Sequence, residues 1–192
     1  PGRNCGYCVQ QTKDEGFIIA GQAASLEAGG GELYLVKVDE AGNMEWEQSY
    51  GGPQRASGYY AQQTSDGGYI AAGQITPEGG SGSDAYLVKV GKSGEIQWER
   101  SFGGEGNESA LFVSSAGDGG YIATGWTESF HNRRELYLIK VDAKGRKQWE
   151  ASFCQGSRST GSYVLEAEEG GFLDAGWMES SGTSGSGERD IY

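Results

Sequence analysis

One short segment, TESFHNRR, holds the side chains best suited to binding chemistry. It contains Phe130, Arg133, Arg134 and the only histidine of the chain, His131. Arginine forms paired hydrogen bonds with carboxylates, so this segment could clamp an anion or a carboxylate group. The alternative is a solvated loop in which the basic side chains balance the neighbouring glutamates.

Two tryptophans offer a second candidate surface. Trp126 and Trp177 end two similar segments, YIATGW and FLDAGW, whose other two copies end in Gln22 and Gln74. If the rings are exposed they could stack on sugars, which predicts a lectin. If they are buried, they fill space between neighbouring structural units.

The elements that must position these residues form an internal repeat. The aromatic residue after a glycine turn recurs at intervals of 52, 52 and 51 residues, at Phe17, Tyr69, Tyr121 and Phe172. A tryptophan recurs with similar spacing, at Trp46, Trp98 and Trp149. A repeat of about 50 residues is typical of solenoids and propellers.

Each repeat unit is predicted to contain four short strands. The first strands are expected at 6–12, 58–64, 110–116 and 161–167, and the second at 17–22, 69–74, 121–126 and 172–177. After a loop of variable length, a hairpin supplies the third and fourth strands, at 34–46, 86–98 and 137–149. Short runs of β-branched and aromatic residues without helical periodicity predict an all-β chain.

A four-stranded antiparallel meander that recurs in this way is the signature of a propeller blade. We therefore predict a β-propeller or partial propeller in a single domain, with blades at 1–52, 53–104, 105–155 and, incompletely, 156–192. Tyr192 falls where the fourth hairpin should begin. Three arrangements are open: part of a longer propeller, two chains paired into one ring, or a small ring with a three-stranded last blade. An unpaired strand edge would also allow self-association.

The hairpins resemble the blade signature of pyrroloquinoline-quinone-type β-propellers. The shared spacing is Asp-x-x-Gly-x-x-x-Trp at 39–46 and 142–149, with Gly91 in place of the acid in the second copy. The family's threonine before the glycine is absent, and so is a cofactor constellation. The resemblance therefore implies the fold, and we expect no cofactor. The whole repeat also resembles one common in exported bacterial and archaeal proteins, which implies an extracellular, cell-surface or periplasmic location.

Packing between blades accounts for most of the repeated apolar positions. We expect an aromatic column at Tyr60, Phe112 and Tyr163 and an aliphatic column at Ala61, Val113 and Val164. The column of repeated tryptophans should close each blade against the next, which is a structural role.

Charged side chains also repeat. Acidic residues recur before the third strand at Glu32, Asp84, Glu135 and Asp190, and in the turns at Asp14, Asp66, Asp118 and Glu169. Calcium needs about six to eight oxygens converging from one loop, and the sequence has no D-x-D-x-D-G run. We expect the third-strand lysines to be solvent-side cross-strand partners of these acids, at Lys37, Lys89 and Lys140.

Composition narrows the choice of partners. A formal net charge of -12 repels phosphate backbones and anionic lipid, so we expect no nucleic-acid partner. No apolar run approaches the roughly 20 residues of a membrane span. Cys5 and Cys8 lie on a predicted strand and Cys154 stands alone, which indicates buried or incidental thiols rather than a zinc or redox site. A disulfide would favour an exported protein.

Motifs for catalysis are few. The sequence has no G-x-S-x-G, no metal-spaced histidine pair and no phosphate-binding G-x-x-x-x-G-K-[ST]. We predict a non-enzymatic binding or assembly scaffold that contacts protein or carbohydrate through rim loops or an open blade edge. The rim candidates, none of them a metal ligand, are Trp126, Phe130, His131, Arg133, Arg134 and Trp177. The alternative is a glycan-acting hydrolase or lyase, because the ~5–9 Å separation of two rim carboxylates is a spatial property.

Overall fold

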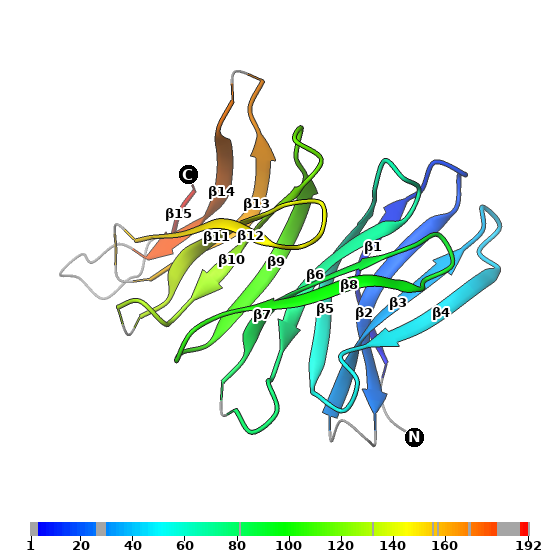
Figure 1. Cartoon of the computed structure of the whole chain (residues 1–192), viewed down its shortest axis with the longest axis horizontal. Helices are drawn as coiled ribbons and strands as arrows, with labels where there is room; N and C mark the ends of the chain where they lie inside the picture. Colours follow the sequence, from blue (N-terminus) through cyan, green and yellow to red (C-terminus); the bar gives the residue numbers. More distant parts are fainter. Residues whose placement is uncertain are drawn as a thin grey trace.

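The computed structural model consists of strands joined by turns and loops (Figure 1). It describes residues 4–25, 30–80, 82–131, 133–154, 156, 158–168, 170–179 and 189–191. This part of the chain contains no helix, and hence none that could cross a membrane. The all-β prediction is therefore confirmed.

The strands form four antiparallel sheets, which we call blades 1 to 4. Blade 1 contains β1 (Cys5–Gln11), β2 (Phe17–Ser25), β3 (Gly30–Val38) and β4 (Met44–Tyr50). Blade 2 contains β5 (Ala56–Gln63), β6 (Tyr69–Ile75), β7 (Asp84–Val90) and β8 (Ile96–Phe102). Blade 3 contains β9 (Glu108–Ser115), β10 (Tyr121–Thr127), β11 (Glu135–Val141) and β12 (Lys147–Phe153). Blade 4 contains β13 (Arg158–Glu166), β14 (Phe172–Glu179) and β15 (Arg189–Ile191).

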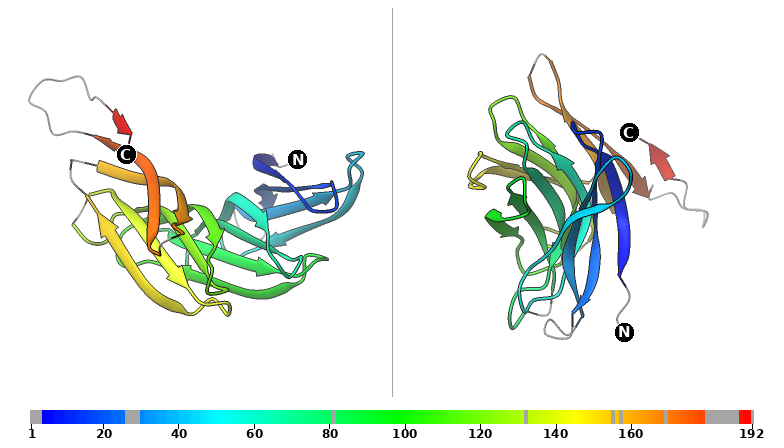
Figure 2. Two further views of the ribbon diagram at one scale, coloured as in Figure 1. Left: turned by 90° about the horizontal axis from the view of Figure 1, so that it is seen from above. Right: turned by 90° about the vertical axis from the view of Figure 1, so that its right-hand side faces the viewer.

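The four blades stack face to face along an open arc (Figure 2). Strand β2 packs on β5, β6 on β9 and β10 on β13, so each blade covers the next. Blades 1 and 4 lie at the two ends of the arc and do not meet (Figure 2). The fold is thus a partial propeller, and a closed ring of four blades is not formed. Tyr192, Glu169 and the side chain of Asp190 lie outside the described residues.

The predicted apolar columns lie between the blades. Ala61, Val113 and Val164 are all 0% exposed. The ring centroids of Tyr60 and Phe112 are 4.3 Å apart, and those of Phe112 and Tyr163 are 4.1 Å apart. Tyr163 nevertheless remains 47% exposed, because nothing in the described structure covers the outer face of blade 4.

The tryptophans close each blade against the next, as predicted. Each ring lies 5.6 to 5.8 Å from the aromatic residue that begins the second strand of the following blade, in the pairs Trp46–Tyr69, Trp98–Tyr121 and Trp149–Phe172. Trp98 also reaches the next hairpin turn, where an added Cβ on Gly145 would lie 2.6 Å from its ring. Gly145 has a φ of +73°, so both its backbone conformation and the ring above it require glycine.

A bulge gives the first and second strands of each blade their register. At Gly125 an added Cβ would lie 1.9 Å from the carbonyl oxygen of Ser109, and the pairing of β9 with β10 shifts at this point. Only glycine permits this approach of two backbones. The bulge sets the position of the next residue, Trp126, at the end of the strand.

The third-strand lysines are buried, contrary to the prediction that they face solvent. Lys37, Lys89 and Lys140 are 2%, 2% and 4% exposed. In blade 2, Lys89 Nζ lies 2.9 Å from Asp66 Oδ2 and donates to the carbonyl of Val90 at 3.1 Å. The physical reason is that the turn before β6 folds over the third strand and encloses the ammonium group. The lysine therefore pairs with the acidic residue of this turn on the side that faces away from solvent.

The cysteines carry no bond to one another. Cys5 and Cys8 lie on β1, as predicted, and both are free thiols. Cys154 is also free and follows β12. Cys5 is exposed and Cys8 and Cys154 are half-buried, so the expectation of buried thiols is wrong, because all three lie at edges or ends of strands, and their incidental role stays a prediction.

Candidate functional site

The loop between β10 and β11 carries the segment TESFHNRR at the junction of blades 3 and 4. Two backbone hydrogen bonds fix it: the amide of Glu128 donates to the carbonyl of Asn107 at 2.8 Å, and the amide of Ser159 donates to the carbonyl of Arg134 at 3.0 Å. The first bond holds the loop to the start of blade 3 and the second to blade 4. The loop is therefore positioned by both blades.

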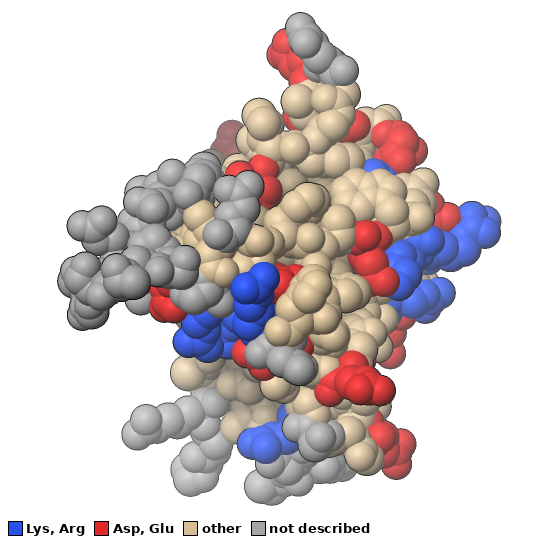
Figure 3. All heavy atoms as spheres, turned by 90° about the vertical axis from the view of Figure 1, so that its left-hand side faces the viewer, with Lys and Arg blue, Asp and Glu red and all other residues tan. Residues whose placement is uncertain are grey.

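An open cleft of about 530 Å³ lies at this junction. Its described lining consists of Arg133, Arg134, Arg158, Glu128 and Gly106, which sets three guanidinium groups against one carboxylate. We call it the arginine cleft. The end of the molecule that carries blade 4 shows basic side chains gathered in patches among scattered acidic ones (Figure 3). In a chain of net charge -12, basic side chains thus outnumber acidic ones in the described lining of this cleft.

Arg134 is the most firmly held of the three arginines. Its guanidinium carbon lies 3.8 Å from the centroid of the Trp126 ring, a cation–π contact. Its Nη2 lies 3.7 Å from Glu128 Oε1, and its Nε is enclosed without a hydrogen-bond partner in the described part of the chain. Trp126 therefore supports Arg134, and one face of its ring is already occupied.

His131 and Arg133 share one buried acid. His131 Nδ1 lies 2.8 Å and Arg133 Nε 3.3 Å from Glu135 Oε1. Burial acts to raise the pKa of Glu135, but hydrogen bonds from Ser152, Arg133 and His131 lower it below its usual range. These pairings match the alternative of a charge-balanced loop for His131 and in part for Arg133. They do not account for Arg158.

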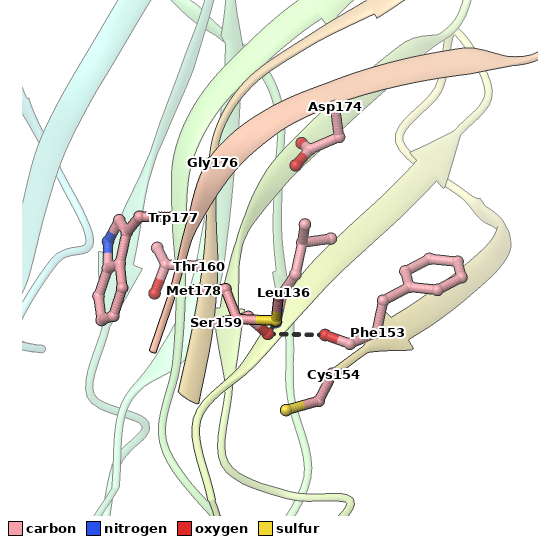
Figure 4. Close-up of a pocket in the computed structure, with 9 residues that line it drawn as sticks. All are labelled: Leu136, Phe153, Cys154, Ser159, Thr160, Asp174, Gly176, Trp177 and Met178. Carbon is pink, nitrogen blue, oxygen red and sulfur yellow. Dashed lines mark hydrogen bonds between the residues drawn. The ribbon is translucent and has the colours of Figure 1, made fainter. Parts of the chain in front are cut away.

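Phe130 and Trp177 lie apart from the arginine cleft. Phe130 is 48% exposed, and its ring centroid is 6.3 Å from that of Tyr137. Trp177 lines a different pocket, together with Asp174 and Phe153 (Figure 4). The structure thus gathers Trp126, Arg133 and Arg134 at one site, with His131 beside it, whereas Trp177 lines the other pocket.

A second, smaller cavity lies between blades 3 and 4. It measures about 200 Å³, and its wall is largely apolar, with Leu136, Phe153 and Met178 (Figure 4). One charged group reaches it, Asp174, whose two carboxylate oxygens are enclosed, with the hydroxyl of Thr124 from blade 3 beside them. Burial raises the pKa of Asp174 to about 6, an effect that the neighbouring Thr124 hydroxyl offsets only in part.

Comparison with known proteins assigns no function to this region, so its function is inferred from its geometry. No family model matches the chain, and no curated protein matches its sequence. The resemblance to quinone-type blades therefore stays a prediction, and function is inferred from the arginine cleft and the edge of blade 4.

Two residues of this region were not among the sequence-based candidates. Arg158 occupies the same repeat position as Arg55, so a search for residues that break the repeat passes over it. Asp174, by contrast, does break the repeat: the corresponding residues are Ile19, Ala71 and Ala123. An acidic residue at a position that is apolar in the other three repeat units is a signal by which Asp174 could be found from the sequence.

We expect Asp174→Ala to stabilise the protein near neutral pH. The pKa of Asp174 is raised in the folded state, to about 6, from about 3.9 in an unfolded chain. Folding therefore binds a proton between these values, and the stability that this provides is complete below pH ~4 and is lost as the pH rises through 6. Discounted for partial solvent screening, the gain at pH 7.5 should be about 1–2 kcal/mol.

Urea denaturation of the wild type and of Asp174→Ala between pH 4 and 8 measures this difference. It should grow with pH and level off above about pH 7. Asp174→Asn, which cannot ionise, should show the same flattened pH dependence. A difference that stays constant from pH 4 to 8 would show that Asp174 does not titrate in this range.

Proposed function

We propose that the chain is a non-enzymatic binding and assembly scaffold that holds an anionic group of a protein or carbohydrate partner in the arginine cleft. The observation that carries the proposal is the arrangement of Arg133, Arg134 and Arg158 around one cleft with a single lining carboxylate, Glu128. The open edge of blade 4 provides a second contact.

The charge of the whole chain restricts which anions fit. A net charge of -12 repels polyanions at a distance, so nucleic acids and anionic membranes are poor partners. A single carboxylate or sulfate on a largely neutral partner avoids this repulsion and still gains the local guanidinium contacts. Because Trp126 and Glu128 hold Arg134 in place, little side-chain entropy is lost when such a group binds.

The alternative, a glycan-acting hydrolase or lyase, has less support from the same cleft. Glycoside hydrolysis generally requires two carboxyl groups that flank the bond to be broken. Among the described lining residues, Glu128 is the one carboxylate, and Arg134 lies beside it. We therefore prefer the binding role.

Calorimetry with matched acidic and neutral ligands tests the proposal. The full chain is titrated with glucuronic acid, an acidic peptide and their neutral counterparts, at low and at moderate salt. Binding of an acidic ligand should be at least tenfold weaker in Arg134→Gln and Arg158→Gln, because a hydrogen bond to a charged group contributes about 1.5–3 kcal/mol.

The matched control is Arg146→Gln. Arg146 lies in the β11–β12 hairpin, its side chain is 72% exposed, and it pairs with Asp142. This variant should bind like the wild type. Equal binding of acidic and neutral ligands, or an equal loss in Arg146→Gln, contradicts the proposal. Turnover of a glycan, abolished by Glu128→Gln, would favour the enzyme.

A further inference from the structure

One carboxylate, that of Glu135, holds two basic side chains of the loop beside the arginine cleft. His131 Nδ1 lies 2.8 Å and Arg133 Nε 3.3 Å from the same oxygen, Glu135 Oε1. The side chain of Glu135 is 2% exposed, whereas those of His131 and Arg133 are 66% and 45% exposed. The acid is therefore fixed inside the protein, and both basic side chains reach it from the solvent side.

Glu135 keeps its negative charge over the pH range in which a histidine titrates. Burial acts to raise the pKa of Glu135, but hydrogen bonds from Ser152, Arg133 and His131 lower it below its usual range. A histidine side chain ordinarily titrates near pH 6.5, and an arginine stays charged. Of the three side chains His131, Arg133 and Glu135, the histidine is therefore the one that changes its charge between pH 5 and 8.

Other charged or titratable groups surround the loop without pairing with Glu135. Glu108 of β9 is 0% exposed and accepts hydrogen bonds from the hydroxyls of Thr127 and Ser129, both at 2.7 Å. The remaining groups around the loop are Glu128 and Arg134 on the loop itself, Tyr137 on β11, Cys154 after β12 and Arg158 on β13. Within the described part of the chain, His131 and Arg133 are thus the two basic partners of Glu135.

The charges at the cleft do not cancel. The guanidinium groups of the three cleft arginines face two carboxylates, those of Glu128 and Glu135. One positive charge is therefore left over when His131 is neutral, and two when it is protonated. The first state matches a single carboxylate or sulfate, and the second attracts such an anion more strongly.

Protonation of His131 also changes what Arg133 is needed for. While the imidazole is neutral, Arg133 is the full positive charge that compensates the buried carboxylate of Glu135. A protonated His131 supplies that charge over the shorter contact, 2.8 Å against 3.3 Å. The other described bond of Arg133 is weak, from Nη1 to the carbonyl of Gly156 at 3.4 Å. Its side chain, which already lines the cleft, can then turn toward an anion.

We propose that His131 and Arg133 are alternative partners of Glu135, and that protonation of His131 releases Arg133 to a carboxylate or sulfate in the arginine cleft. The cleft then binds such an anion more tightly as the pH falls from 7.5 to 5.5. This inference rests on the proposed function of the cleft and adds its regulation by pH. Because coupling between two binding events is reciprocal, a bound anion must in turn favour the protonated state of His131.

Calorimetry of the full chain with glucuronic acid at pH 5.5, 6.5 and 7.5, at constant ionic strength, tests the coupling. The ligand carboxyl group stays ionised throughout. Binding should be about fivefold tighter at pH 5.5 than at pH 7.5, at the lower end of the usual range for coupled sites. His131→Gln should remove this increase, and the control Arg146→Gln should keep it.

Arg133→Gln separates the release of Arg133 from a simple gain of positive charge. If protonation acts by freeing Arg133, this variant should also lose most of the increase at low pH. An affinity of the wild type that does not change with pH contradicts the inference. So does an increase that persists in full in either His131→Gln or Arg133→Gln.

Nuclear magnetic resonance measures the reverse effect directly. Because His131 is the only histidine of the chain, its imidazole signals identify themselves. With saturating glucuronic acid, the midpoint of their pH titration should rise by about 0.7 pH, which corresponds to the fivefold change in affinity. In Arg133→Gln the ligand should leave the midpoint nearly in place. A midpoint that the ligand does not move in the wild type overturns the inference.

The same experiments keep this inference apart from the proposed function. If glucuronic acid binds equally at all three pH values and still requires Arg134 and Arg158, the pH coupling is wrong and the binding role stands. If no acidic ligand binds at any of these pH values, both are wrong.

Discussion

Replacing Trp98 with alanine should lower the free energy of unfolding by about 3–5 kcal/mol, the usual cost of removing a large ring from a packed core. The side chain is 8% exposed and its ring lies 5.8 Å from that of Tyr121 in the next blade. Its Nε1 donates to the carbonyl of Ala143 at 3.0 Å, and the backbone of Gly145 lies against the ring. The substitution would therefore leave a cavity and an acceptor without its donor.

Chemical denaturation followed by circular dichroism measures this loss, and Trp149→Ala is the matched control. Trp149 makes the same contact with Phe172 but is 37% exposed, so its removal should cost clearly less. Equal losses in the two variants would contradict the view that burial between complete blades sets the size of the effect.

Asp66→Ala should be the second most damaging substitution, at about 2–3 kcal/mol. It would leave the ammonium group of Lys89, 2% exposed, without the carboxylate that lies 2.9 Å away. Loss of one partner of a fully buried pair costs about 3–5 kcal/mol. We expect less here because the side chain of Asp66 is 51% exposed, and water can reach part of the site.

A double-mutant cycle and a pH series test this interpretation. In a Lys89→Met background, Asp66→Ala should lower the free energy of unfolding only slightly, because no buried ammonium group is left without its carboxylate. Burial acts to raise the pKa of Asp66, but hydrogen bonds from Thr64, Lys89 and the Gly68 amide lower it to about 2. The stability from this depressed pKa is present above pH ~4 and is lost as the pH falls toward 2, so wild type and variant should converge over that range.

The strands and the blade interfaces follow from local sequence patterns. A period-two alternation and a glycine turn specify each strand pair without reference to the rest of the chain. Because one blade cannot bury its own faces, repeated copies must stack on one another. The repeated tryptophans are then buried between neighbouring blades. For this reason the contact of Trp98 with the next blade could be predicted from spacing alone.

The lysine positions were not predictable in the same way. Alternation places Lys89 on one face of its strand, but whether that face is exposed to solvent depends on a turn some twenty residues earlier in the chain. The same limit applies to Arg158, which meets Arg133 and Arg134 only because blades 3 and 4 are neighbours. The charge and the length of a side chain follow from its residue type, whereas its burial and its partners depend on the rest of the fold.

By itself, the sequence determined an all-β chain of repeated blades and its interblade core, because strand period and turn chemistry are local. It also contained the signal of Asp174, an acid at an apolar position. Only the tertiary structure decided that the described blades stack along an arc, that the three arginines share one cleft, and that Asp174 lies in a cavity between blades 3 and 4. These are relations between residues far apart in sequence, and they arise from how twisted sheets pack on one another.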